Sequence, residues 1–229
     1  MTFSCSPLPK NFPTKWTDIS RVVQQSVNRV CRDDKFLLTK GANERAVAHR
    51  LAVYLENDFS DWNIDCEYNR LGDSSDPKRQ PRQELLSLLK VREKFLLVND
   101  LYEEHVRRAE EALLGRGVNG ELSNLDRLAY PDLIVHRRKC GFHNLLVVEI
   151  KTLGAPNWQT LIDFAKLTSF SLESDLADCS EEAEYPRYQF GLFLEFGTAE
   201  LSSALLFQGG NGVVLEPSSL QVKCSPAAG

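Results

Sequence analysis

Three charged residues of this chain, Asp132, Glu149 and Lys151, have the types and the spacing that could do chemistry. Asp132 follows Pro131 at the start of the apolar run PDLIVHRR, and Glu149 and Lys151 lie two positions apart in the later apolar run NLLVVEIK. Side chains alternate between the faces of a strand, so Glu149 and Lys151 are expected on the same face. If the two runs pair as a hairpin, Asp132 comes alongside them. Two carboxylates and an ammonium in one place suit metal-assisted hydrolysis of a phosphodiester.

The elements that must position these residues can be read from hydrophobic periodicity. Strands are predicted over 131 to 138 and 144 to 151, joined by a short turn that contains Gly141. The strand over 188 to 196 is apolar on both faces for most of its length, which is typical of a central strand. The other predicted elements are helix 17 to 32, a helix within 41 to 59, strand 62 to 70, helix 158 to 172, and strands 204 to 208 and 212 to 216.

A third acid, Glu44, begins the predicted helix that Asn43 can cap. The spacing of Glu44, Ala48, Leu51 and Leu55 puts this acid on the edge of the buried face. An N-terminal turn acid favoured by the helix dipole is the alternative interpretation.

The length and composition are those of one globular domain over residues 1–229, and apolar positions at helical spacing predict a helical insertion over 72–128. Hydrophobic residues make up 42% and charged residues 26%, which is ordinary for a globular protein. No apolar stretch approaches the roughly 20 residues of a membrane span, so we expect a cytoplasmic protein without a membrane partner. The six cysteines are scattered without a close pair, which favours reduced thiols. The net charge of −5 argues against nonspecific coating of nucleic acid.

The order of these elements and motifs resembles the PD-(D/E)xK nuclease superfamily. The resemblance covers roughly residues 41 to 70 and 130 to 196: an acidic helix, a strand, a strand with Pro-Asp, a strand with Glu-x-Lys, a helix and a strand. It implies an α/β, restriction-endonuclease-like fold, in which helices flank a mixed central sheet and the helical insertion is extra material. It also implies a metal-dependent nuclease that hydrolyses DNA phosphodiester bonds, in DNA processing or in defence.

The resemblance implies a role for each site residue. Asp132 and Glu149 would be metal ligands for Mg2+ or Mn2+, together with the main-chain carbonyl of Ile150. Lys151 would orient or deprotonate the attacking water, or offset charge in the transition state. Glu44 corresponds to a helix acid that helps to hold metal-bound water or a second ion.

Further residues could contact the substrate. Members of this superfamily often carry a polar residue that faces the site on the helix after the Glu-x-Lys strand. Gln159, Asp163 and Lys166 lie on one side of that helix here, and Lys166 is the preferred candidate. Arg70 and Arg137 are candidates for contacts with the nucleic-acid backbone.

Other interpretations stay open from the sequence. Asp132, Glu149 and Lys151 could form an ion pair without a catalytic role. A catalytically inactive member of the same fold could act as a nucleic-acid-binding or protein-assembly module, and the helical insertion could supply a homodimer face. An unrelated α/β interaction protein is a third possibility. The group His136, Cys140 and His143 invites a zinc hypothesis, although a polar hairpin also explains it.

Overall fold

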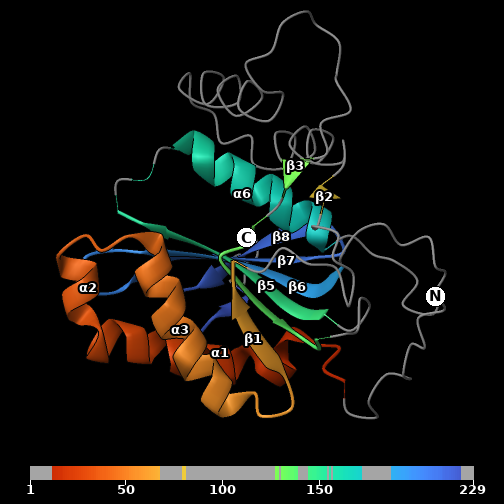
Figure 1. Cartoon of the computed structure of the whole chain (residues 1–229), viewed down its shortest axis with the longest axis horizontal. Coiled ribbons are helices and arrows are strands. Elements are labelled where there is room, and N and C mark those ends of the chain that lie inside the picture. The colour runs from red at the N-terminus through yellow and green to blue at the C-terminus, as the bar shows by residue number, and fades with distance from the viewer. Residues whose placement is uncertain are drawn as a thin grey trace, which may run out of the picture.

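A mixed β-sheet with helices on both faces forms the described part of the chain (Figure 1). The structure is a computed structural model. It describes residues 12–67, 79–80, 127–128, 130–138, 144–153, 155, 157–171 and 187–222.

Seven strands make up the sheet, in the spatial order β1-β4-β5-β6-β7-β8-β9. Their bounds are β1 Asn63–Cys66, β4 Leu133–His136, β5 Asn144–Thr152, β6 Tyr188–Phe196, β7 Leu201–Gln208, β8 Asn211–Glu216 and β9 Gln221–Val222. The pair β5 and β6 is parallel, and every other neighbouring pair is antiparallel. A parallel pair needs a crossover connection, and helix α6 (Asn157–Phe170) supplies it between β5 and β6.

The helices divide between the two faces of the sheet (Figure 1). Helices α1 (Trp16–Asp33), α2 (Lys35–Thr39) and α3 (Glu44–Asp58) lie on one side, and α6 lies on the other. Val148 and Ile150 of β5 belong to the same apolar cluster as the buried faces of α1 and α3. Val147 belongs to a second cluster with residues of α6. By strand alternation, Glu149 and Lys151 therefore emerge on the face that α6 covers.

The predicted hairpin is confirmed, and its register fixes where Asp132 lies. Strands β4 and β5 pair antiparallel with Leu133 opposite Val148. Asp132 immediately precedes Leu133, and Glu149 immediately follows Val148. Asp132 therefore lies beside the end of β5 that carries Glu149 and Lys151.

The start of helix α3 follows from local chemistry. The side chain of Asn43 accepts a hydrogen bond from the main-chain N–H of Ala46 at 2.9 Å, as predicted for an N-cap. The cap satisfies one of the free N–H groups at the helix start. Glu44 is consequently the first helical residue, with its side chain near the end of β5.

A long-range contact joins the first helix to the last described turn. The indole N–H of Trp16 donates to the carbonyl of Leu220 at 2.8 Å in a buried setting. The Trp16 ring also meets Phe190 of β6 edge-on, with 5.7 Å between ring centroids.

Several sequence predictions differ from the structure. The strands predicted over 131 to 138 and 62 to 70 are shorter in the structure, where β4 and β1 have 4 residues each. Helix α2 and strand β9 were not predicted, since elements of 5 and 2 residues are too short to show a period.

Most of the predicted insertion, residues 72–128, lies outside the described residues. Its four described residues form a two-stranded antiparallel ladder, β2 (Arg79–Gln80) with β3 (Arg127–Leu128). The helical character of the insertion stays a prediction. Among the helices that the structure describes, none combines the length and the apolar character needed to cross a membrane.

Candidate functional site

Six charged side chains gather where β5 ends between the two helical layers. We call this group the Lys151 cluster; its members are Glu44, Asp132, Glu149, Lys151, Asp163 and Lys166. They come from the start of α3, the start of β4, the end of β5 and the middle of α6. Residues far apart in the sequence therefore share one site.

Lys151 links the two helical layers through ion pairs. Its Nζ lies 2.7 Å from Oδ2 of Asp163 on α6 and 3.1 Å from Oε2 of Glu44 on α3. The same ammonium donates to the carbonyl oxygen of Ile150 at 3.4 Å. The Lys151 side chain is only 7% exposed, so its ammonium is largely shielded from water.

Lys166 makes a second bridge in the cluster. Its Nζ lies 2.8 Å from Oε1 of Glu149 and 2.8 Å from Oδ1 of Asp163. Asp163 is thus shared between two lysines, one on each of its carboxylate oxygens. The positions 163 and 166 are three apart on α6, which puts both side chains on one face of that helix.

Asp132 is held against β5 by a main-chain contact. Its Oδ2 accepts a hydrogen bond from the N–H of Ile150 at 2.7 Å. This bond uses the N–H of the residue between Glu149 and Lys151, so Asp132 is fixed beside the Glu-x-Lys segment.

The cluster carries more negative than positive charge. Its four carboxylates and two ammonium groups give a formal charge of −2 when all six are ionised. Burial raises the pKa of Glu149 well above its usual range, although the charge of Lys166 acts against this rise. Burial also raises the pKa of Asp132, and the hydrogen bond from Ile150 opposes it. The two lysines therefore do not fully compensate the four carboxylates, of which Glu149 and Asp163 are buried and Glu44 and Asp132 are half-buried.

The two lysines respond in the opposite sense. Burial alone would lower the pKa of Lys151, but the charge and the hydrogen bond of Asp163, together with the charges of Glu44 and Asp132, raise it. For Lys166, burial is likewise outweighed by the charges of Glu149 and Asp163, and its pKa also rises. Both side chains are consequently ammonium ions at neutral pH.

The ligand atoms and the charge of the cluster can be compared with those that a divalent metal ion requires. Within the described residues, no group of three or more His, Cys, Asp or Glu residues is arranged as a metal site. Mg2+, however, is usually bound through one or two carboxylates and keeps several waters. The carboxylates of Asp132 and Glu149 and the carbonyl of Ile150 are donors of that type. The formal charge of −2 is also what one divalent cation would balance, so the donor set and the charge fit such an ion.

Most of the predicted site residues that the structure describes meet in this cluster. Glu44, Asp132, Glu149 and Lys151 all belong to it. Lys166, predicted as a nucleic-acid contact, instead forms ion pairs inside the cluster, where its side chain is 14% exposed. The sequence places its partner Asp163 on the polar side of the helix but indicates no role for it. The spacing of three residues between Asp163 and Lys166 could have indicated that the two side chains meet.

The remaining candidates lie elsewhere. Arg137 follows the opposite end of β4, where its guanidinium lies 5.3 Å from the ring centre of Trp62. Nε2 of His136 lies 2.7 Å from Oδ2 of Asp65. Arg70, and the Cys140 and His143 of the zinc hypothesis, fall outside the described residues.

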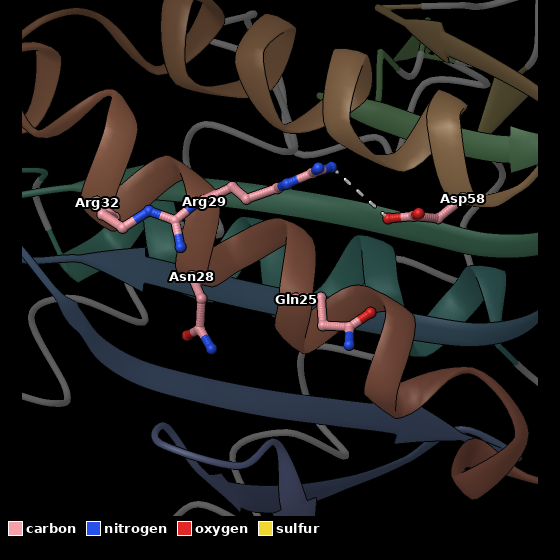
Figure 2. Close-up of a pocket in the computed structure, with 5 residues that line it drawn as sticks. All are labelled: Gln25, Asn28, Arg29, Arg32 and Asp58. Atoms are coloured by element: carbon pink, nitrogen blue, oxygen red, sulfur yellow. Dashed lines mark ion pairs between the residues drawn. The ribbon is translucent and has the colours of Figure 1, made fainter.

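A separate polar pocket lies between α1 and the end of α3. Figure 2 shows the side chains that line it, which are Gln25, Asn28, Arg29, Arg32 and Asp58. Arg29 reaches across the pocket to Asp58, with 4.0 Å between Nη1 and Oδ2. Arg32 pairs with its neighbour Asp33. These contacts are solvent-exposed, unlike those of the Lys151 cluster, so the pocket carries no functional assignment.

Comparisons with known proteins found no match for this chain. No family model, no curated protein and no solved structure matches the chain.

Proposed function

We propose that this chain is a metal-dependent nuclease of the PD-(D/E)xK type that hydrolyses DNA phosphodiester bonds at the Lys151 cluster. One observation carries the proposal: the buried acid Glu149 and the half-buried acid Asp132 stand beside two ammonium groups, in a cluster with a formal charge of −2. A purely structural cluster would be more stable with balanced charge, because excess buried charge is costly. A site for a divalent cation explains the excess.

Asp132 and Glu149 would hold the Mg2+ or Mn2+ ion with the carbonyl of Ile150. When bound, the ion would polarise the phosphate and lower the pKa of the attacking water. The hydrogen bond from the Ile150 N–H orients the Asp132 carboxylate for this role. Lys166 keeps an ammonium beside Glu149 and so favours its ionised, ligating form.

Lys151 would act as a fixed positive charge. Its raised pKa keeps it protonated at neutral pH, so it is suited to donate hydrogen bonds to the phosphate oxygens rather than to take a proton from water. Asp163 and Glu44 hold the ammonium from two sides. An ammonium fixed before the reaction needs no reorganisation in the transition state.

The order of elements also supports the proposal. Helix α3 with its acid is followed by β1, the hairpin of β4 and β5, helix α6 and the parallel strand β6. The same order carried the resemblance to the restriction-endonuclease-like fold. This fold assignment remains part of the proposal.

The test is cleavage of linear, circular and single-stranded DNA by the full chain with Mg2+ or Mn2+. The unaltered protein should cut at least one substrate, and Asp132→Asn and Lys151→Met should each lower the rate by at least about 100-fold. Lys40→Met is the matched control, since Lys40 is exposed at the end of α2. No cleavage by any preparation, together with no change in melting temperature on adding metal, would remove the enzyme proposal.

A second function, a catalytically inactive binding or assembly module, is favoured by a different observation. Lys151 and Lys166 already pair with three of the four carboxylates, and such pairs also occur in purely structural sites. DNA retention without cleavage, unaffected by Asp132→Asn, would support this function instead.

A further inference from the structure

We propose that Arg45 binds a backbone phosphate of the nucleic-acid substrate at the rim of the Lys151 cluster, and that Glu67 holds its guanidinium there before the substrate arrives. The inference rests on the proposed nuclease function and adds a substrate-positioning residue to it. Neither residue stood out in the sequence.

Arg45 lies at the rim because of its place in α3. It follows Glu44, whose carboxylate contacts Lys151, and both belong to the first turn of the helix. The Arg45 side chain is 76% exposed, whereas Lys151 is 7% exposed. A long cation at the solvent side of the site therefore follows directly after a half-buried acid of the site.

Glu67 ties this cation to the other side of the site. Its Oε1 lies 2.6 Å from Nε of Arg45. Its main-chain N–H donates to the carbonyl of Asp132 at 3.3 Å, so Glu67 is attached to a proposed metal ligand. The ion pair thus joins α3, which contributes Glu44, to the residue after β1, whose main chain contacts Asp132.

The backbone at Glu67 is unusual for its residue type. Its φ is +50°, in the left-handed region that residues other than Gly, Asn and Asp seldom adopt. Such conformations persist where surrounding contacts hold them and concentrate at functional sites. Here the turn follows the end of β1 and orients Glu67 toward Arg45.

The chemistry of the two residues suits a phosphate. The Lys151 cluster has an excess of negative charge, which repels an approaching phosphodiester unless a cation stands near its entrance. A guanidinium binds phosphate oxygens through charge-assisted, often paired hydrogen bonds. A phosphate would compete with the Glu67 carboxylate for the guanidinium, so Glu67 acts as a removable counter-ion.

The chain offers a closely matched control in the pair Arg32 and Asp33. Nε of Arg32 lies 2.7 Å from Oδ1 of Asp33, with exposures of 71% and 43%. The corresponding exposures for Arg45 and Glu67 are 76% and 42%. The two arginines differ in place, since Arg32 lines the polar pocket of Figure 2 and Arg45 flanks the Lys151 cluster.

The experiment measures binding of a labelled short DNA by fluorescence anisotropy, with the full chain in Ca2+ over a series of salt concentrations. Arg45→Ala should weaken binding about tenfold and reduce the slope of affinity against salt by about one. Arg45→Lys should lose part of that affinity, and Glu67→Gln should tighten binding. Arg32→Ala should bind as the unaltered protein does.

Cleavage by the same preparations is measured in parallel. If the unaltered protein cuts DNA and Arg45→Ala binds DNA as tightly as Arg32→Ala, the role of Arg45 is overturned while the nuclease function stands. If the unaltered protein neither cuts nor binds DNA, both proposals are overturned. A melting temperature for Arg45→Ala that matches the unaltered protein shows that the binding loss is not unfolding.

Discussion

Removing the ammonium of Lys166 tests whether the buried charges of the Lys151 cluster depend on one another. The change is Lys166→Met, which keeps an unbranched side chain of similar length but removes the charge. Lys166 Nζ lies 2.8 Å from both Glu149 and Asp163. At an effective dielectric constant of about 20, each contact contributes roughly 6 kcal/mol of Coulomb energy, before the cost of removing the charges from water is subtracted.

The net effect is expected to be smaller than that sum. Breaking a buried pair by removing one partner typically lowers the free energy of unfolding by about 3 to 5 kcal/mol. We expect a loss of that size at pH 8, measured by urea unfolding with a two-state analysis. The loss should shrink as the pH is lowered, because the pKa of Glu149 is raised by burial and protonation of this carboxyl removes its need for the ammonium.

A double-variant cycle separates this mechanism from general damage to the core. Adding Glu149→Gln to Lys166→Met should recover part of the lost stability, with a coupling energy of about 1 to 3 kcal/mol. Lys40→Met, at an exposed position, should change the stability by less than about 0.5 kcal/mol. If Lys166→Met unfolds within about 1 kcal/mol of the unaltered protein, with the same pH dependence, the electrostatic account of the cluster is wrong.

Three further predictions concern other parts of the site. Because the pKa of Glu149 is raised in the folded state, the folded protein binds more protons than the unfolded chain. The free energy of unfolding should therefore fall as the pH rises from about 5 to 8. Glu149→Gln should make this dependence on pH weaker, as urea titrations can check. Mg2+ or Mn2+ should raise the melting temperature of the unaltered protein but not of Asp132→Asn; equal shifts in both would place the ion elsewhere. Asn43→Ala removes the cap of α3 and should lower the free energy of unfolding by about 1 kcal/mol, whereas Asn43→Gly should lower it by only a few tenths, as urea unfolding can check.

The sequence predicted the parts of the site that depend on local periodicity. Strand alternation predicted that Glu149 and Lys151 share a face, and the hairpin signal brought Asp132 beside them. The Asn43 cap predicted where α3 begins and hence where Glu44 lies. Each of these inferences uses residues that are near one another in the chain or in one strand pair.

Other contacts could not be predicted, because they depend on how distant elements pack. Asp163 is 4% exposed, although it lies on the polar side of the predicted helix. The reason is that the polar side of α6 faces the charged end of β5, so the usual rule of an apolar buried face fails there. The pair of Arg45 and Glu67 depends on a left-handed residue after β1, which no periodic pattern reveals.

The bond from Trp16 to the carbonyl of Leu220 has a consequence for how the molecule folds. It closes a loop of almost the entire described chain, with 204 positions between donor and acceptor. Contacts of such separation form late, since the entropy of bringing distant segments together opposes them. Emission from this indole would therefore report the moment at which the first helix joins the last turn, after the hairpin that carries the charged residues has had time to form.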